Sequence, residues 1–332
     1  MKNLSTAAAL LALASAAPLG AQEEPEGQPS PNEIVEQASA EEWQAIAADD
    51  LLVMTLAPPD RGPGQASADG SEREVVIQLM PPPFSQGWVE NIRTLARAGW
   101  YDRLSINRVQ DNYVVQWGDP NVDNPEADGP AKALLEGLNS VPESEYTQRH
   151  WCNFHICPPL PPVGNLRRFL SSDYGSDTFL KGWPVSSYEG QQIAWPVHCY
   201  GMVGVGRGYS PDTGSAAELY TVIGHAPRHL DRNIALVGRV VEGIEHLSSL
   251  PRGKGALGFY EDASKRVPIR SIRVASDLAA SDQPQFEYLS TESEAFARYT
   301  DARADRRDPF FIVPAGGADI CNIPVPVRRV AD

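Results

Sequence analysis

Short runs of β-branched, aliphatic and aromatic residues recur along this chain, and stretches rich in proline, glycine and serine separate them. Runs of roughly four to eight such residues between turn residues are typical of β-strands. The runs that we expect to form strands are 50–56, 74–80, 106–109, 113–116, 202–205, 219–223, 234–241 and 267–274. The pattern therefore predicts a protein made mainly of β-structure.

Other segments carry apolar residues at helical spacing. Trp88, Ile92 and Leu95 lie at positions i, i+4 and i+7 of one predicted helix. This helix is expected to begin after Ser85, a good N-cap residue, and to end before Gly99. Further helices are expected over 244–250 and 293–303. The order of the elements indicates a mostly antiparallel sheet with two covering helices, and closure into a barrel would remove the exposed strand edges.

Residues 106–120 place one arginine and one amide side chain on an otherwise apolar ribbon. Asp111-Asn112 in the middle is a turn signal. We therefore expect two short strands paired as a hairpin. Arg108 lies near the end of the first strand and Gln116 at the end of the second, so a hairpin brings both side chains to one face.

The region 121–200 has little periodicity and many proline, glycine and serine residues. We expect an irregular insertion there, with short helices near 131–138 and 166–170. A structureless stretch of this length is uncommon unless it is functional or cross-linked. Because three of the four cysteines lie in this region, we expect disulfides to staple it.

Residues 1–21 have the pattern of a secretory signal peptide. Lys2 precedes an apolar run over 7–19, and a small-x-small cleavage site ends at Ala21. The apolar run is too short for a bilayer, and no later stretch approaches the roughly 18 apolar residues that a membrane span needs. We therefore expect a soluble protein exported to the periplasm. Residues 22–48, rich in Glu, Pro, Ser and Gln, are expected to form an acidic flexible leader.

The cysteine count fits an exported chain, in which an even number favours disulfides. Four cysteines allow three pairings, of which we favour Cys152–Cys157 as a local loop and Cys199–Cys321 as a long-range link. A cluster of zinc-ligand types offers an alternative: His150, Cys152, His155, Cys157, His198 and Cys199. Disulfides are favoured over zinc in an oxidising compartment, so we expect no metal.

Two blocks of residues follow each other in a specific order. The first contains Asn91, Leu95, Gly99, Tyr101-Asp102, Asn107-Arg108-Val109, Tyr113-Val114-Val115-Gln116 and Trp117-Gly118-Asp119. The second contains 201–207, 213–215, 218–220, 230–231 and 237–243. With both blocks in order, the chain resembles the cyclophilins, the barrel family of peptidyl-prolyl cis-trans isomerases. The resemblance covers about 50–120 and 200–275.

The resemblance implies a fold and a division of the chain. The fold is a closed antiparallel eight-stranded β-barrel capped by two helices, over residues 49–275, with the long stapled insertion at 121–200. Residues 276–332 are then a C-terminal extension, which we expect to pack on the barrel.

The resemblance also assigns roles by position. Arg108 falls on the catalytic arginine of the family, and Gln116 falls on the glutamine that supports it. The residues implied to bind the substrate are Tyr113, Val114, Glu218, Tyr220, His229 and Leu230. Val114 replaces a methionine of the family pattern, and Glu218 replaces a glutamine that contacts the substrate backbone. These departures bear on the choice of substrate.

The implied reaction needs no nucleophile, metal or cofactor, because no bond is broken. The barrier of about 18–20 kcal/mol arises from delocalisation of the amide nitrogen lone pair. A fixed guanidinium N–H aimed at the prolyl nitrogen favours the twisted amide, in which the lone pair has returned.

The expected partners are proline-containing segments of unfolded or folding exported proteins, bound by a monomer. A net charge of −15 argues against nucleic acid as a partner, and we expect no membrane insertion. The alternative is a catalytically weak cyclophilin-like module that binds proline-containing segments of partner proteins.

Overall fold

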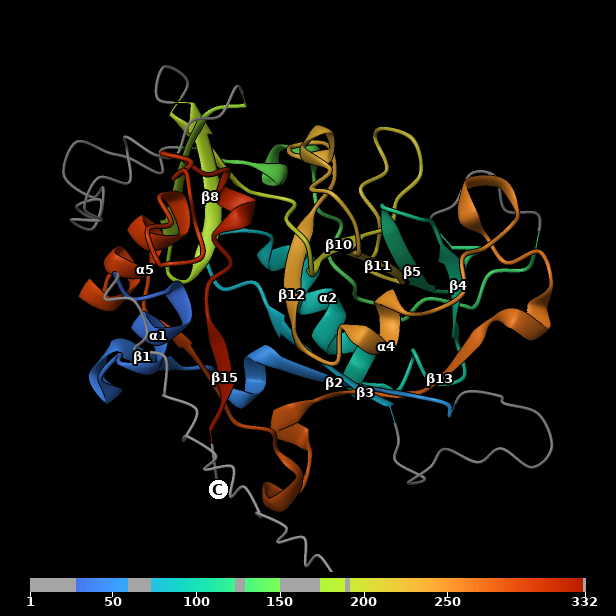
Figure 1. Cartoon of the computed structure of the whole chain (residues 1–332). Coiled ribbons are helices and arrows are strands. Elements are labelled where there is room, and N and C mark those ends of the chain that lie inside the picture. Colours follow the sequence, from blue (N-terminus) through green and yellow to red (C-terminus); the bar gives the residue numbers. More distant parts are fainter. Residues whose placement is uncertain (1–27, 59–72, 123–128, 150–173, 189–191, 331–332) are drawn as a thin grey trace, which may run out of the picture.

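The computed structural model describes residues 28–58, 73–122, 129–149, 174–188 and 192–330. Eight strands close into a barrel in the order β10-β11-β5-β4-β13-β2-β3-β12 (Figure 1). Their bounds are β2 Leu51–Leu56, β3 Arg73–Leu79, β4 Ser105–Val109, β5 Val114–Gly118, β10 Met202–Val205, β11 Glu218–Val222, β12 Leu236–Glu242 and β13 Val267–Val274. Every neighbouring pair is antiparallel. The predicted mainly β fold with a closed antiparallel barrel is confirmed.

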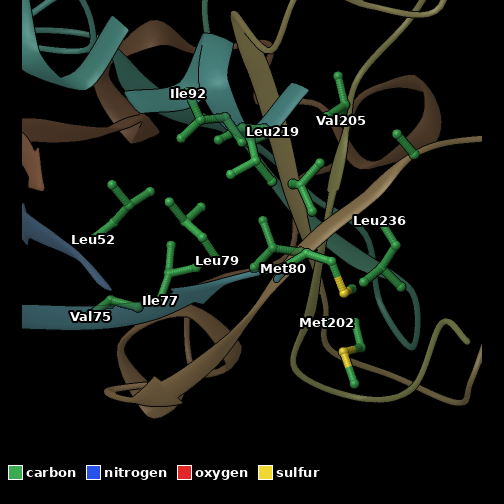
Figure 2. Close-up of a cluster of buried hydrophobic side chains, with 14 of the residues drawn as sticks. Leu52, Val75, Ile77, Leu79, Met80, Ile92, Met202, Val205, Leu219 and Leu236 are labelled. Carbon is green, nitrogen blue, oxygen red and sulfur yellow. The ribbon is translucent and has the colours of Figure 1, made fainter. Parts of the chain in front are cut away.

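Two helices cover the barrel, as predicted. Helix α2 (Gln86–Arg97) packs against β12 and β13, and α4 (Glu245–Ser248) packs against β3. Trp88, Ile92 and Leu95 of α2 are fully buried. Figure 2 shows Ile92 in one apolar cluster with Leu219 of β11. Burying each such side chain contributes about 1.5–3 kcal/mol, so the apolar face of α2 fixes the helix on the barrel.

The insertion contains a second sheet that the sequence did not indicate. Its strands, in the order β6-β9-β8-β7, are β6 Gln148–Arg149, β7 Ser176–Leu180, β8 Trp183–Tyr188 and β9 Ile193–Pro196. Lys181 and Gly182 join β7 to β8 with positive φ angles of 48° and 83°, as a two-residue hairpin loop requires. The expected irregular insertion is therefore wrong for the segments that form this sheet, whereas the described residues 129–142 are irregular, as expected.

The helix expected over 131–138 is also absent, since these residues form turns and irregular chain. The helix expected over 166–170 lies outside the described residues.

Residues 28–48 are ordered, although we expected residues 22–48 to be a flexible leader. Helix α1 (Pro31–Glu36) packs against α5 (Glu294–Ala304), and strand β1 (Trp43–Ala45) pairs with β14 (Phe286–Leu289). Strand β14 in turn pairs with β15 (Val327–Arg329) (Figure 1). The physical reason is burial, because the side chains of Ile34 and Trp43 are only 3% and 6% exposed.

A disulfide joins Cys199 to Cys321 and so ties the C-terminal extension to the segment before β10. This pairing confirms the favoured long-range link. Cys152 and Cys157 lie outside the described residues, as does the expected signal peptide over 1–21. No helix within the described ranges is long and apolar enough to cross a membrane.

Candidate functional site

The guanidinium of Arg108 is held by three acceptors. The β4–β5 hairpin sets Arg108 opposite Gln116, as the sequence predicted, and the turn between them has Asn112 at a φ of 50°. Arg108 Nη1 donates to Gln116 Oε1 at 2.8 Å, and Nε donates to the carbonyl oxygen of Leu257 at 2.7 Å. Nη2 donates to Gln110 Oε1. One acceptor on each nitrogen fixes the plane of the group.

Aromatic rings and burial complete the surroundings of Arg108. Its Cζ lies 5.7 Å from the centre of the Tyr113 ring and 5.4 Å from that of Phe259. Burial lowers the pKa of the Arg108 guanidinium, while Tyr113 and Glu218 partly offset this effect. The group stays charged, because an arginine does not lose its proton in a protein.

Arg108 forms one wall of a pocket of about 400 Å³. The other lining residues are Tyr113, Val114, Gln116, Gly206, Arg207, Gly208, Tyr209, Glu218, Tyr220, Leu230, Ile234, Leu257 and Phe259. Part of the lining is apolar, since Val114, Tyr220 and Val222 form a buried cluster on which Leu230 and Ile234 pack. The pocket therefore places one fixed cation beside a surface suited to an apolar ring.

The structure brings seven of the eight predicted catalytic and substrate-binding residues to this pocket, and His229 is the one outside its lining. The His229 ring instead stacks on Tyr113, with centroids 6.0 Å apart and planes 13° apart. Burial raises the pKa of the Tyr220 phenol well above its usual value, so this side chain stays protonated. Glu218 also lines the pocket and is 2% exposed.

Three residues that contact the guanidinium of Arg108 were not foreseen from the sequence: Gln110, Leu257 and Phe259. Leu257 and Phe259 belong to the glycine-rich loop 251–260. This loop lies along β4, and Phe259 forms an isolated antiparallel β-bridge with Arg108. Gly258, at a φ of 85°, approaches within 2.7–2.9 Å of Gln110 and Val109, measured from the position of an added Cβ. The run of glycines was the one sequence signal of this close packing.

Two of the six residues in the alternative zinc cluster are engaged in other bonds. Cys199 is in a disulfide, and the His198 ring is hydrogen-bonded to Asp231 and Tyr220. The other four members of the cluster lie outside the described residues. Among the residues that the structure describes, no group of three or more His, Cys, Asp or Glu is arranged to hold a metal ion.

Comparisons with known proteins give the family. The model of the family "Cyclophilin type peptidyl-prolyl cis-trans isomerase/CLD" matches residues 87–274, more than half of the chain. No curated protein matches.

Two solved structures match this chain. The crystal structure of cyclophilin AquaCyp293 from Hirschia baltica is 20% identical, with a TM-score of 0.59 and coverage of 88% of this chain and 98% of that one. A cyclophilin-type isomerase from Cryptosporidium parvum, crystallised with the dipeptide Ala-Pro, is 10% identical, with a TM-score of 0.35 and coverage of 60% and 92%. On the match over 87–274, together with the closed barrel, this chain belongs to the family of cyclophilin-type peptidyl-prolyl cis-trans isomerases.

Proposed function

We propose that this protein catalyses rotation about X-Pro bonds and that Arg108 is the residue that lowers the barrier. The observation that carries the proposal is the clamped guanidinium, which three acceptors hold on the wall of the apolar pocket. The bonds to Gln116 and Gln110 use one N–H of each terminal nitrogen. A second N–H on each nitrogen is then left to face a substrate.

The proposed mechanism is electrostatic. As the prolyl amide twists, its nitrogen regains a lone pair and becomes an acceptor, so the donation from Arg108 strengthens toward the transition state. Because Gln116, Gln110 and Leu257 hold the group in advance, little reorganisation is needed during the reaction. Val114, Tyr220 and Leu230 would hold the proline ring while the preceding residue rotates.

The substrates that we propose are proline-containing segments of exported proteins. The disulfide between Cys199 and Cys321 supports an oxidising compartment, such as the periplasm. Glu218 supports a peptide ligand, because a carboxylate in the groove accepts backbone N–H groups of an extended chain. N-terminal sequencing of the mature protein from a periplasmic extract tests the export, and a first residue near Gln22 is expected.

A protease-coupled isomerisation assay on a short X-Pro peptide tests the catalytic role. Arg108→Ala is expected to lower kcat/KM by about a hundredfold or more, the typical loss of a preorganised donor. Arg108→Lys is expected to be nearly as poor, because an ammonium cannot engage three acceptors in one plane. Arg270→Ala, on the exposed side of β13, is the matched control and should stay within about twofold of wild type.

Equal rates for Arg108→Ala and wild type would refute the catalytic assignment. A wild type that binds the peptide but does not accelerate isomerisation would favour the binding module instead.

A further inference from the structure

Four buried polar side chains form a hydrogen-bond network that begins at Tyr220, in the lining of the pocket. The hydroxyl of Tyr220 lies 2.9 Å from His198 Nε2, and His198 Nδ1 lies 2.8 Å from Asp231 Oδ1. Arg228 Nε donates to Asp231 Oδ2 at 2.8 Å. All four residues are at most 5% exposed. Burying this many polar groups costs free energy unless each one is hydrogen-bonded, so we look for a structural or functional role of this network.

Asp231 fixes the orientation of the imidazole. Its Oδ1 also accepts the backbone N–H of His198 at 3.0 Å. Burial raises the pKa of the Asp231 carboxyl, but the hydrogen bonds from His198 and the charge of Arg228 outweigh burial and lower the pKa overall. Since an ionised carboxylate only accepts, Nδ1 carries a proton and Nε2 is turned to the Tyr220 hydroxyl.

Arg228, at the far end of the network, contacts residues outside the barrel. Arg228 donates to both oxygens of Asp177 on β7, at 3.2 and 3.4 Å, and lies 3.8 Å from Asp319 in the C-terminal extension. The disulfide partner Cys199 directly follows His198, and its bond to Cys321 holds the same extension. The insertion and the extension thus both hold the arginine that holds Asp231.

Tyr220, at the near end of the network, is closely confined. The ring stacks on His198, with centroids 6.3 Å and planes 10° apart. On the other side, a Cβ added at Gly204 would lie 2.3 Å from the Tyr220 hydroxyl. The glycine therefore makes room for the hydroxyl, and the side chain cannot swing away from this place without breaking its hydrogen bond to His198.

We propose that His198 is a positioning residue, which holds the hydroxyl of Tyr220 so that the ring stays at a fixed position beside the proline of the substrate. The inference rests on the proposed function of this pocket. The hydroxyl serves no other described partner, and an apolar ring alone would fill the same cluster with Val114 and Val222. A fixed position of the Tyr220 side chain is what the buried hydrogen-bond network adds.

A double-mutant cycle tests the coupling. Tyr220→Phe and His198→Leu are each expected to raise KM about fivefold, the effect of about 1 kcal/mol, with kcat within about twofold of wild type. The double variant is expected to be no worse than either single variant, because both remove the same hydrogen bond. His198→Gln, which returns an amide near the Nε2 position, is expected to restore most of the loss. His225→Leu, an exposed histidine, is the matched control.

Binding is measured in parallel, so that this proposal does not depend on catalysis. The dissociation constant of the tetrapeptide Ala-Ala-Pro-Phe, from NMR chemical-shift titration, should follow the same fivefold pattern as KM. If wild type binds but does not isomerise, the proposed function fails while this cycle still reports on Tyr220. Losses that multiply in the double variant, or an unchanged dissociation constant in Tyr220→Phe, would overturn the positioning role. A fall in melting temperature without a change in binding would also overturn it.

Discussion

At the scale of single residues, the site depends on how Arg108 is held. Its three acceptors come from strand β5, from the residue that directly follows β4 and from one distant loop. Gln116 was predictable, because it lies opposite Arg108 in a hairpin that local turn residues define. Leu257 was not, because it is 149 residues away along the chain and contributes a backbone carbonyl, for which any residue type would serve.

Gln110 offers a test at this scale. Gln110→Leu removes one acceptor of a charged donor and frees the guanidinium plane to tilt. We expect kcat to fall about tenfold with little change in KM, since the loss is largest where the donor must be aligned. Steady-state kinetics on the X-Pro peptide measure both. Gln44→Leu, on the exposed side of β1, is the control, and an unchanged kcat in Gln110→Leu would contradict the clamp.

At the scale of elements, the barrel strands were predictable and the second sheet was not. Each barrel strand is a compact run of β-forming residues between turn residues, so its identity is local. Strand β8 reads Trp-Pro-Val-Ser-Ser-Tyr and is buried on both faces, so it shows no alternation of polar and apolar residues. One face meets the barrel, where Arg239 of β12 donates to the Gly182 carbonyl at 2.8 Å and lies over Trp183.

Long-range contacts also explain why residues 28–48 are ordered. Their composition is acidic and polar, which favours disorder for an isolated segment. Order comes from contacts with residues about 250 positions later, such as the bond from the Ala295 N–H to Glu42, separated by 253 residues. Patterns within a short window do not contain such contacts.

The junction of β5 and β11 gives a prediction for an element. Gly118 has a φ of 121°, and an added Cβ would lie 2.2 Å from the Ala217 carbonyl oxygen. Gly118→Ala is therefore expected to lower the free energy of unfolding by about 3 kcal/mol, through backbone strain plus a clash with the neighbouring strand. Urea unfolding measures the loss.

Gly137→Ala is the matched control for Gly118→Ala. Gly137 also has a positive φ, of 83°, but no atom lies within 4 Å of an added Cβ. Its substitution carries the backbone strain alone, about 1 kcal/mol. Equal losses in the two variants would show that the β5–β11 contact contributes nothing.

At the scale of the whole molecule, buried charges join the barrel to the parts outside it. Arg239 is buried, at 6% exposed, where β12 meets the second sheet, and burial lowers its pKa to about 10, so it remains a cation at neutral pH. Arg228 joins the barrel to Asp177 of the insertion and faces Asp319 of the extension. These groups make the barrel, the insertion and the extension mutually dependent.

The pH dependence of the free energy of unfolding tests the contribution of Asp231, which accepts a hydrogen bond from Arg228. The folded pKa of Asp231 lies below its usual value of about 3.9, so its contribution is present above that pH and is lost as the pH falls through the folded pKa. Asp231→Asn is expected to cost about 3 kcal/mol at pH 7, because it leaves buried partners uncompensated. The gap to wild type should narrow below about pH 4. Denaturant unfolding from pH 7 to 2.5 measures it, and a gap of constant size would contradict the ionised state.

The disulfide is the covalent link at this scale. Cys199 and Cys321 are 122 residues apart, so the bond closes a long loop and lowers the entropy of the unfolded chain. Cys199→Ser/Cys321→Ser is expected to lower the free energy of unfolding by about 4 kcal/mol, and reduction of wild type should have the same effect. Guanidinium unfolding with and without reductant measures both.

Cys152→Ser/Cys157→Ser is the control for this variant, because the pairing that we propose for these residues spans only a short stretch of sequence. Loop entropy predicts a smaller loss for the shorter loop. If both double variants lost equal stability, the entropy of the long loop would not be the source. If the Cys199/Cys321 variant lost none, the network of Arg228, Asp177 and Asp319 and the β1–β14–β15 sheet would hold the extension without the bond.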